Sequence, residues 1–194
     1  MRVPVARRRT AFAVALAVVA LGAEGRPGDP PGYGLRLLLP AQCSFPDPGS
    51  SDCRLEIGDE VVVIRVRDGD HAIGDALRAR LPEGIPGLAV TATQARLDAP
   101  PPDVALHAGE VAPAEAAPGA DGCARFFYET RAPERTGTLT WSTVVGLRCL
   151  EHHPADGVLQ DVTVTVTSYR AAETEASDTF RGLAAEVLAS FEMR

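Results

Sequence analysis

A strict alternation of valine and threonine at residues 162–167 is the clearest periodic pattern in this chain. Because successive side chains of a β-strand point to opposite faces, the alternation predicts a half-buried strand with one apolar and one hydroxyl-bearing face. Residues 60–66 are instead β-branched and mostly apolar, which is typical of a strand buried on both faces. Weaker apolar runs predict further strands at residues 35–39, 88–97, 126–128 and 139–147.

Two segments are predicted to be amphipathic helices. In residues 180–191 the apolar positions follow the spacing i, i+3, i+4, i+7, i+8 and i+11 without interruption. The polar side of this segment is mixed in charge rather than basic, so we expect its apolar side to pack on a core and not on a membrane. A second helix, of about 11 residues, is predicted from Asp70, a suitable N-cap, to the stop signal Pro82.

The order of these elements indicates the fold class. Strands adjacent in sequence, with helices at intervals, predict an α+β fold in which two amphipathic helices pack on one face of an antiparallel sheet. Residues 35–194 are predicted to form a single domain, preceded by a Gly/Pro-rich spacer at 26–34. Residues 98–122 are rich in Pro, Ala, Gly and acidic side chains, so we expect a long surface loop there, and 103–107 is a candidate for one short strand within it.

The first 25 residues have the pattern of a signal peptide. Four arginines precede an uncharged apolar run at 11–23, and the run ends near small residues that signal peptidase accepts. The run is shorter than the roughly 20 residues of a spanning helix, so no stable membrane insertion is expected after cleavage. An uncleaved anchor is the alternative. We therefore predict an exported protein, periplasmic or extracellular.

Export makes disulfide bonds the expected state of the four cysteines. Cys43 and Cys53 bracket a loop dense in turn residues, which a disulfide would close. Cys123 and Cys149 each lie 13 residues from Thr136, so in a hairpin centred there they would face each other across adjacent strands. Of the three connectivities that four cysteines allow, this arithmetic favours the pairings 43–53 and 123–149.

Composition excludes several classes of chemistry and narrows the choice of partners. All 19 basic residues are arginine, so a Walker A loop and Schiff-base catalysis by lysine are both excluded. Removing residues 1–25 leaves 15 basic and 25 acidic residues. This acidic balance repels phosphate backbones, and no run of arginines is interleaved with aromatic residues, so nucleic acid is not an expected partner. A basic envelope protein or exported protein would fit better.

One short segment, residues 151–156, gathers side chains that could carry chemistry. The adjacent histidines of this segment, His152 and His153, could bind zinc or copper if a third ligand such as His107 or His71 came from elsewhere in the fold. Adjacent side chains on an extended chain point apart, so a polar hairpin loop is the alternative interpretation. No catalytic motif is found and no cofactor is expected. Trp141 is the candidate anchor for a protein interface.

The leading functional hypothesis is a non-enzymatic, exported binding or interaction protein. It rests on the combination of a leader, disulfides that would make a surface rigid, and the lack of a recognisable catalytic set. Two alternatives stay open. One is a small metal-dependent hydrolase using His152 and His153, and the other is a structural protein of the cell envelope.

Overall fold

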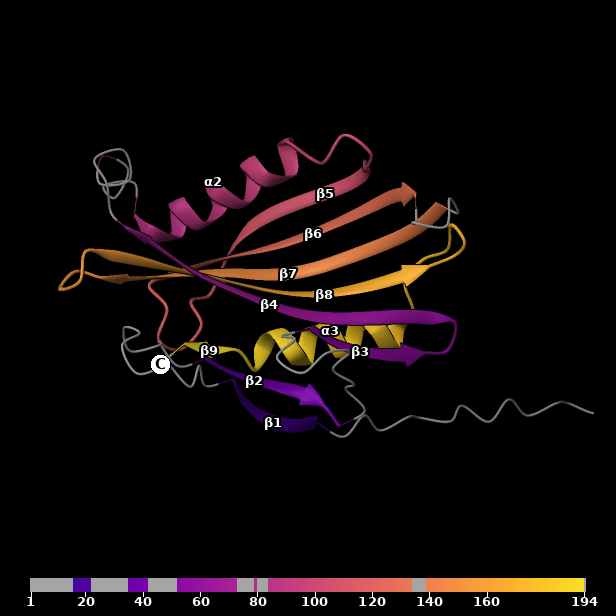
Figure 1. Ribbon diagram of the computed structural model, residues 1–194, viewed down its shortest axis with the longest axis horizontal. Coiled ribbons are helices and arrows are strands. Elements are labelled where there is room, and N and C mark those ends of the chain that lie inside the picture. The colour runs from indigo at the N-terminus through magenta and orange to yellow at the C-terminus, as the bar shows by residue number, and fades with distance from the viewer. Residues whose placement is uncertain are drawn as a thin grey trace, which may run out of the picture.

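The centre of the molecule is a six-stranded antiparallel sheet (Figure 1). The computed structural model describes residues 16–21, 35–41, 52–72, 79, 84–133 and 139–193. In spatial order, the strands are β3 (Asp52–Ile57), β4 (Glu60–Ala72), β8 (Val158–Arg170), β7 (Leu139–His153), β6 (Gly122–Pro133) and β5 (Ala105–Ala114). All neighbouring pairs are antiparallel, so β5 to β8 form a meander and the hairpin β3–β4 extends the sheet beyond β8.

A second, smaller sheet has the order β1-β2-β9. Its strands are β1 (Leu16–Leu21), β2 (Leu35–Pro40) and β9 (Glu192–Met193). β2 is the strand predicted at 35–39, whereas β1 lies inside the predicted signal peptide. Removing residues 1–25 would therefore leave β2 paired with β9 alone. Within the described ranges, no helix has both the length and the apolar character needed to cross a membrane.

The two faces of β8 confirm the alternation seen in the sequence. Val162, Val164 and Val166 are completely buried and point to one face of the sheet, which we call the α3 face. The threonines at 163, 165 and 167 point to the other face, which we call the α2 face. Strands are also present at the predicted positions 60–66, 126–128 and 139–147, and each is longer than its apolar run. The expectation that 60–66 is buried on both faces is wrong, because Val61, Val63 and Arg65 are only half-buried.

The two helices of the described chain lie on opposite sides of the sheet (Figure 1). Helix α3 (Asp178–Ala189) begins after Ser177, whose hydroxyl accepts a hydrogen bond from the Phe180 amide at 3.1 Å. Its buried side chains belong to the same apolar cluster as the valines of β8. Helix α2 (Ile85–Asp98) contacts β5, β6 and β7 on the α2 face. Helix α2 is not one of the predicted helices; the second predicted helix, at 70–82, lies mostly outside the described residues, so the expectation that it shares the face of α3 stays a prediction.

Helix α2 replaces the strand that was predicted at 88–97, and this prediction is also wrong. Pro86 is in the first turn, where its fixed φ favours a helix and its missing N–H is not needed. The β-branched residues suggested a strand, but Thr91 and Thr93 donate hydrogen bonds to the carbonyls of Gly87 and Ala89, one helical turn back. These bonds satisfy hydroxyl groups that would otherwise compete with the backbone.

Two further boundaries differ from the prediction. Asp70 is not an N-cap, because β4 continues to Ala72 and Asp70 pairs with Gln160 of β8. Most of the helix predicted after it, residues 73–78 and 80–83, lies outside the described residues. The predicted loop at 98–122 contains the ten-residue strand β5, which overlaps the short strand expected at 103–107 and is longer than it. β5 is an edge strand, which is why Pro113 is tolerated within it.

A disulfide joins Cys123 on β6 to Cys149 on β7, as the hairpin arithmetic predicts. The two residues are direct register partners, their Cα atoms are 4.1 Å apart, and both side chains are completely buried. Cys53 is also completely buried. Its predicted partner Cys43 lies outside the described residues, so that pairing stays a prediction.

Replacing Glu60 with alanine is expected to lower the free energy of unfolding by about 2–3 kcal/mol. The buried Glu60 carboxylate accepts hydrogen bonds from the Ser168 hydroxyl at 2.9 Å and from the Ser177 amide at 2.7 Å, which joins β4, β8 and the start of α3. The substitution leaves both donors without this acceptor. Urea denaturation measures the loss, with the exposed Glu56→Ala as the control, expected to change stability by less than about 0.5 kcal/mol. Equal losses for the two variants would contradict the assigned role.

Candidate functional site

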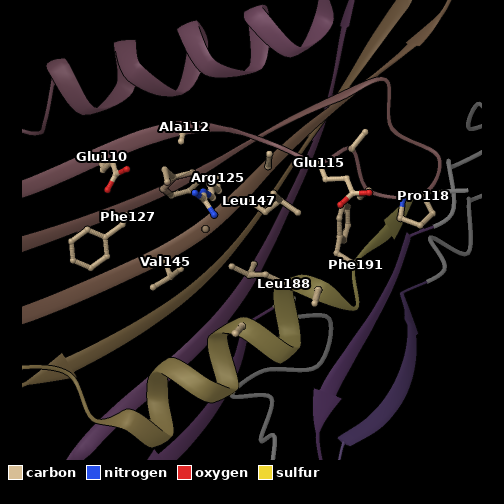
Figure 2. Close-up of a pocket in the computed structure, with 17 residues that line it drawn as sticks. Glu110, Ala112, Glu115, Pro118, Arg125, Phe127, Val145, Leu147, Leu188 and Phe191 are labelled. Atoms are coloured by element: carbon tan, nitrogen blue, oxygen red, sulfur yellow. The ribbon is translucent and has the colours of Figure 1, made fainter.

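A cavity of about 710 Å³ lies on the α3 face, between strands β5 to β7 and the C-terminal part of α3 (Figure 2). Figure 2 shows Val145 and Leu147 on the sheet side of this cavity and Leu188 on the helix side. Its charged side chains are Glu110, Glu115 and Arg125, together with a largely apolar lining. Because both signs of charge are present, this cavity does not select strongly for the charge of a ligand.

A second cavity, of about 490 Å³, lies on the α2 face between the sheet, α2 and the segment that follows α2. Four arginines line it, and we call it the arginine pocket: Arg65, Arg67, Arg96 and Arg148. Hydroxyl groups of threonine, serine and tyrosine provide most of the remaining polar lining. None of the described residues that line this pocket is an aspartate, glutamate, histidine or cysteine.

Strand register brings three of these arginines together. Thr163 of β8 is paired with Arg67 of β4 on one side and with Arg148 of β7 on the other. Directly opposed residues of an antiparallel sheet point to the same face, so both guanidinium groups project toward α2. Arg65 is two residues from Arg67 and shares that face. Arg96 approaches from the last turn of α2.

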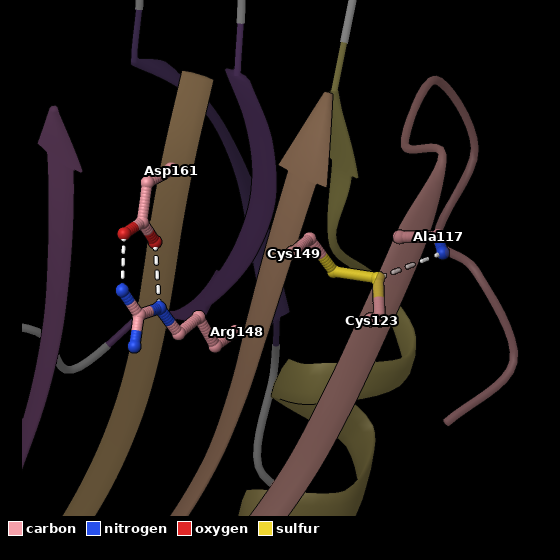
Figure 3. The surroundings of a disulfide bond; sticks show 5 residues. All are labelled: Ala117, Cys123, Arg148, Cys149 and Asp161. Atoms are coloured by element: carbon pink, nitrogen blue, oxygen red, sulfur yellow. Dashed lines mark hydrogen bonds and ion pairs between the residues drawn. A yellow bond between two sulfur atoms is a disulfide. The ribbon is translucent and has the colours of Figure 1, made fainter. Parts of the chain in front are cut away.

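Two of the four arginines are held by carboxylates. Arg148 forms a bidentate pair with Asp161, in which its Nε donates to Oδ1 at 2.9 Å (Figure 3). Arg65 forms a second bidentate pair with Asp52, with its Nε donating to Oδ1 at 2.8 Å. The hydrogen bond from Arg65 is the main cause that lowers the pKa of Asp52 below its usual range. Asp52 is therefore ionised at neutral pH and neutralises its partner.

The other two arginines, Arg67 and Arg96, form no ion pair within the part of the chain that the structure describes. Burial raises the pKa of the nearby Tyr128 hydroxyl, while the positive charges of Arg96, Arg67 and Arg65 act in the opposite direction. Tyr128 lines the pocket together with these arginines of α2 and β4.

Beside this basic end, the pocket is apolar. The Phe126 ring lies over Gly146 of the neighbouring strand, where a Cβ would come within 2.1 Å of the ring Cζ atom. The same ring is nearly parallel to Tyr128, with centroids 6.1 Å apart. The other apolar side chains of the lining are Leu97, Pro100, Pro101, Val104, Leu106, Ala132 and Val144. The absence of a side chain at Gly146 therefore allows the Phe126 ring to pack against the sheet in this pocket.

Of the histidines singled out from the sequence, His107 lies far from His152 and His153, whereas His71 has its Nε2 atom 3.3 Å from the Asp161 carboxylate. The His107 ring contacts Trp141 near one end of β7, with ring centroids 4.7 Å apart and an angle of 42° between the ring planes. His152 and His153 are at the other end of the same strand, about 36 Å along it at about 3.3 Å per residue. His153 instead has its Nε2 atom 3.5 Å from the Glu151 carboxylate. The structure finds no group of three metal-binding side chains among the residues it describes.

Trp141, the candidate interface anchor, is half-buried on β7. Its ring contacts His107 and also lies 5.4 Å from the guanidinium carbon of Arg131. These contacts explain the placement of the ring within the molecule. Its role in a protein interface stays a prediction.

The chain matches no protein-family model and no curated protein sequence. Function is therefore argued from the geometry of the arginine pocket. Sequence reasoning missed this pocket, because its arginines come from β4, α2 and β7 and form no cluster along the chain. The one local signal is the spacing of Arg65 and Arg67, which places two cations on the same face of a strand.

Proposed function

We propose that this protein is an exported, non-enzymatic binding protein that holds an organic anion in the arginine pocket. The observation that carries the proposal is the convergence of four arginines around one cavity in a chain of net charge −7. The cavity volume of about 490 Å³ is within the range of pockets that bind small molecules.

The charge balance of the pocket supports an anionic ligand. Asp52 and Asp161 compensate Arg65 and Arg148, which leaves the lining with a net positive charge. A carboxylate, phosphate or sulfonate would supply the missing negative charge, and arginine binds such groups with two parallel hydrogen bonds.

The chemistry of the lining supports binding without turnover. Serine, threonine and tyrosine hydroxyls act as nucleophiles when an adjacent general base such as histidine, a carboxylate or lysine activates them, and the described lining contains none of these bases. The described lining instead offers arginine, threonine, serine and tyrosine, which donate hydrogen bonds to a ligand.

Export is the second part of the proposal. Its support is the leader-like pattern of residues 1–25 and the disulfide between Cys123 and Cys149, a bond that persists in oxidising compartments. Fractionation of cells followed by intact-mass measurement tests it. A chain in the periplasm or medium that lacks its leader is the expected result, and a full-length chain with reduced cysteines in the cytoplasm would contradict it.

Thermal unfolding with a panel of organic anions tests the binding proposal. We expect at least one of hexanoate, citrate, phenyl phosphate and benzenesulfonate to raise the Tm by about 5–10 °C at saturating concentration. The double variant Arg67→Gln/Arg96→Gln should lose this shift. The control Arg125→Gln removes an exposed arginine from the opposite face and should keep it. An equal shift in the double variant, or no shift with any anion, would refute the proposal.

A further inference from the structure

We infer that the ligand of the arginine pocket is an amphiphile, with a single anionic head group joined to an apolar body. This inference rests on the proposed function and specifies its ligand. Among the described residues, the two exposed large hydrophobic side chains are Leu106 and Tyr169, and both line this pocket. Exposed apolar surface in a concave site is characteristic of a binding surface for apolar groups.

The head group is placed by the arginines that have no carboxylate partner. Arg67 comes from β4 and Arg96 from α2, and both line the pocket together with Tyr128. A single carboxylate or phosphate next to Tyr128 would bind between two cations and accept a hydrogen bond from the phenol. A ligand with further, separated charges would find no unpaired arginine beyond these two in the pocket, because Arg65 and Arg148 are held by Asp52 and Asp161.

The apolar body is placed by the side chains that follow Tyr128 along the sheet. Val144 lies directly opposite Tyr128, and Leu106 lies opposite Thr130, the next residue of β6 on this face. Leu97 of α2 and the prolines after the helix form the opposing wall. An alkyl chain or ring that runs from Tyr128 toward Leu106 would therefore contact apolar surface on both sides.

The hydroxyl groups at this end do not require a polar ligand. Thr130 and Ser142 share a hydrogen bond of 2.6 Å between their hydroxyl oxygens. Thr93 donates its hydroxyl to the Ala89 carbonyl at 2.7 Å. Because these hydroxyls are already paired within the protein, an apolar body can pack over them without leaving an unsatisfied group.

Calorimetric titration with a homologous series of carboxylates tests the inference. Hexanoate, octanoate, decanoate and dodecanoate are used below their micelle concentrations, with the full chain and its disulfide intact. We expect Kd to fall about fourfold for each added methylene. Leu106→Gln should weaken dodecanoate binding and reduce the change in Kd per methylene, because it removes an apolar contact with the chain of the ligand. The variant should fold normally, since Leu106 is exposed and its replacement leaves the core unchanged.

The head group is tested in the same assay. Arg67→Gln should weaken dodecanoate binding by at least about tenfold, whereas Arg125→Gln should leave it unchanged. Dodecyltrimethylammonium, which has the same tail and the opposite charge, should not bind. Decyl phosphate compared with decanoate shows which anionic head is preferred, and tighter binding of either one supports the inference.

Three results would overturn it. Equal Kd values for hexanoate and dodecanoate would refute the apolar body but leave the anion-binding proposal standing. Equal binding of dodecyltrimethylammonium and dodecanoate, or no effect of Arg67→Gln, would refute recognition of the anionic head. No binding by any carboxylate or phosphate of the series, in protein shown by circular dichroism to be folded, would refute the inference and remove the ligand class that the proposed function requires.

Discussion

Replacing Phe180 with alanine is expected to lower the free energy of unfolding by about 3–5 kcal/mol. Phe180 is completely buried and is among the largest side chains in the core. It lies in the first turn of α3, in one apolar cluster with the valines of β8 and with Val62 and Ile64 of β4. The truncation removes the contact area and leaves a cavity where the helix meets the sheet, and both effects reduce stability.

Urea denaturation followed by circular dichroism measures the change, and the m-value should stay constant because the denatured state is the same. The control is Thr179→Ala, an exposed position in the same turn of α3, which should change stability by less than about 0.5 kcal/mol. If Phe180→Ala lost less than about 1 kcal/mol, α3 would not be held on the sheet by this residue. If the variant does not fold, Phe180→Leu, which keeps most of the apolar volume, should give a smaller, measurable loss.

The parts of the fold that the sequence predicts are those whose signal is local. The alternation at 162–167 identifies β8 and assigns each side chain to a face, because a strand has a period of two residues whatever its neighbours. The hairpin of β6 and β7 follows from two apolar runs around one turn, and the distances of Cys123 and Cys149 from Thr136 then fix their register.

The parts that it does not predict depend on partners that are distant in sequence. Residues 85–98 contain β-branched residues that favour a strand, but Pro86 favours the start of a helix, and the helix packs against β5, β6 and β7. β5 has few β-branched residues and is a strand because the edge of β6 offers it a ladder of backbone hydrogen bonds. The end of β4 similarly follows β8 to Ala72 instead of beginning a helix at Asp70.

The candidate site shows the same division. The sequence indicates that Arg65 and Arg67 point to the same side of their strand, and that the three threonines of β8 point to the same side of theirs. It does not show that these two sides belong to the same face of the sheet, or that Arg148 lies across Thr163 from Arg67, because this needs the register of three strands. The position of Arg96 could not be predicted either, because Arg96 lies on α2, a segment that was predicted to be a strand. The cationic pocket of this acidic chain therefore cannot be predicted from the sequence pattern without the strand register and the position of α2.

Removing the disulfide with the double variant Cys123→Ala/Cys149→Ala is expected to lower the free energy of unfolding by about 3.5 kcal/mol. The two cysteines are 26 residues apart, and without the bond the unfolded chain regains the conformational entropy of that loop. Alanine is chosen because both positions are completely buried and a serine hydroxyl would need a new partner. The effect should fall mostly on the unfolded state, since the register of β6 and β7 is also fixed by their backbone ladder.

Chemical denaturation of oxidised wild type and of the variant, each with and without dithiothreitol, measures this contribution. The stability difference should be large under oxidising conditions and nearly vanish in reductant, where the wild type also lacks the bond. Cys149 is next to Arg148, but their side chains point to opposite faces of β7 (Figure 3), so the pair between Arg148 and Asp161 should persist in the variant. Anion binding in the arginine pocket should then survive at temperatures where the variant is folded. A difference that is unchanged by reductant would mean that packing at the two alanines, and not the covalent link, causes the loss.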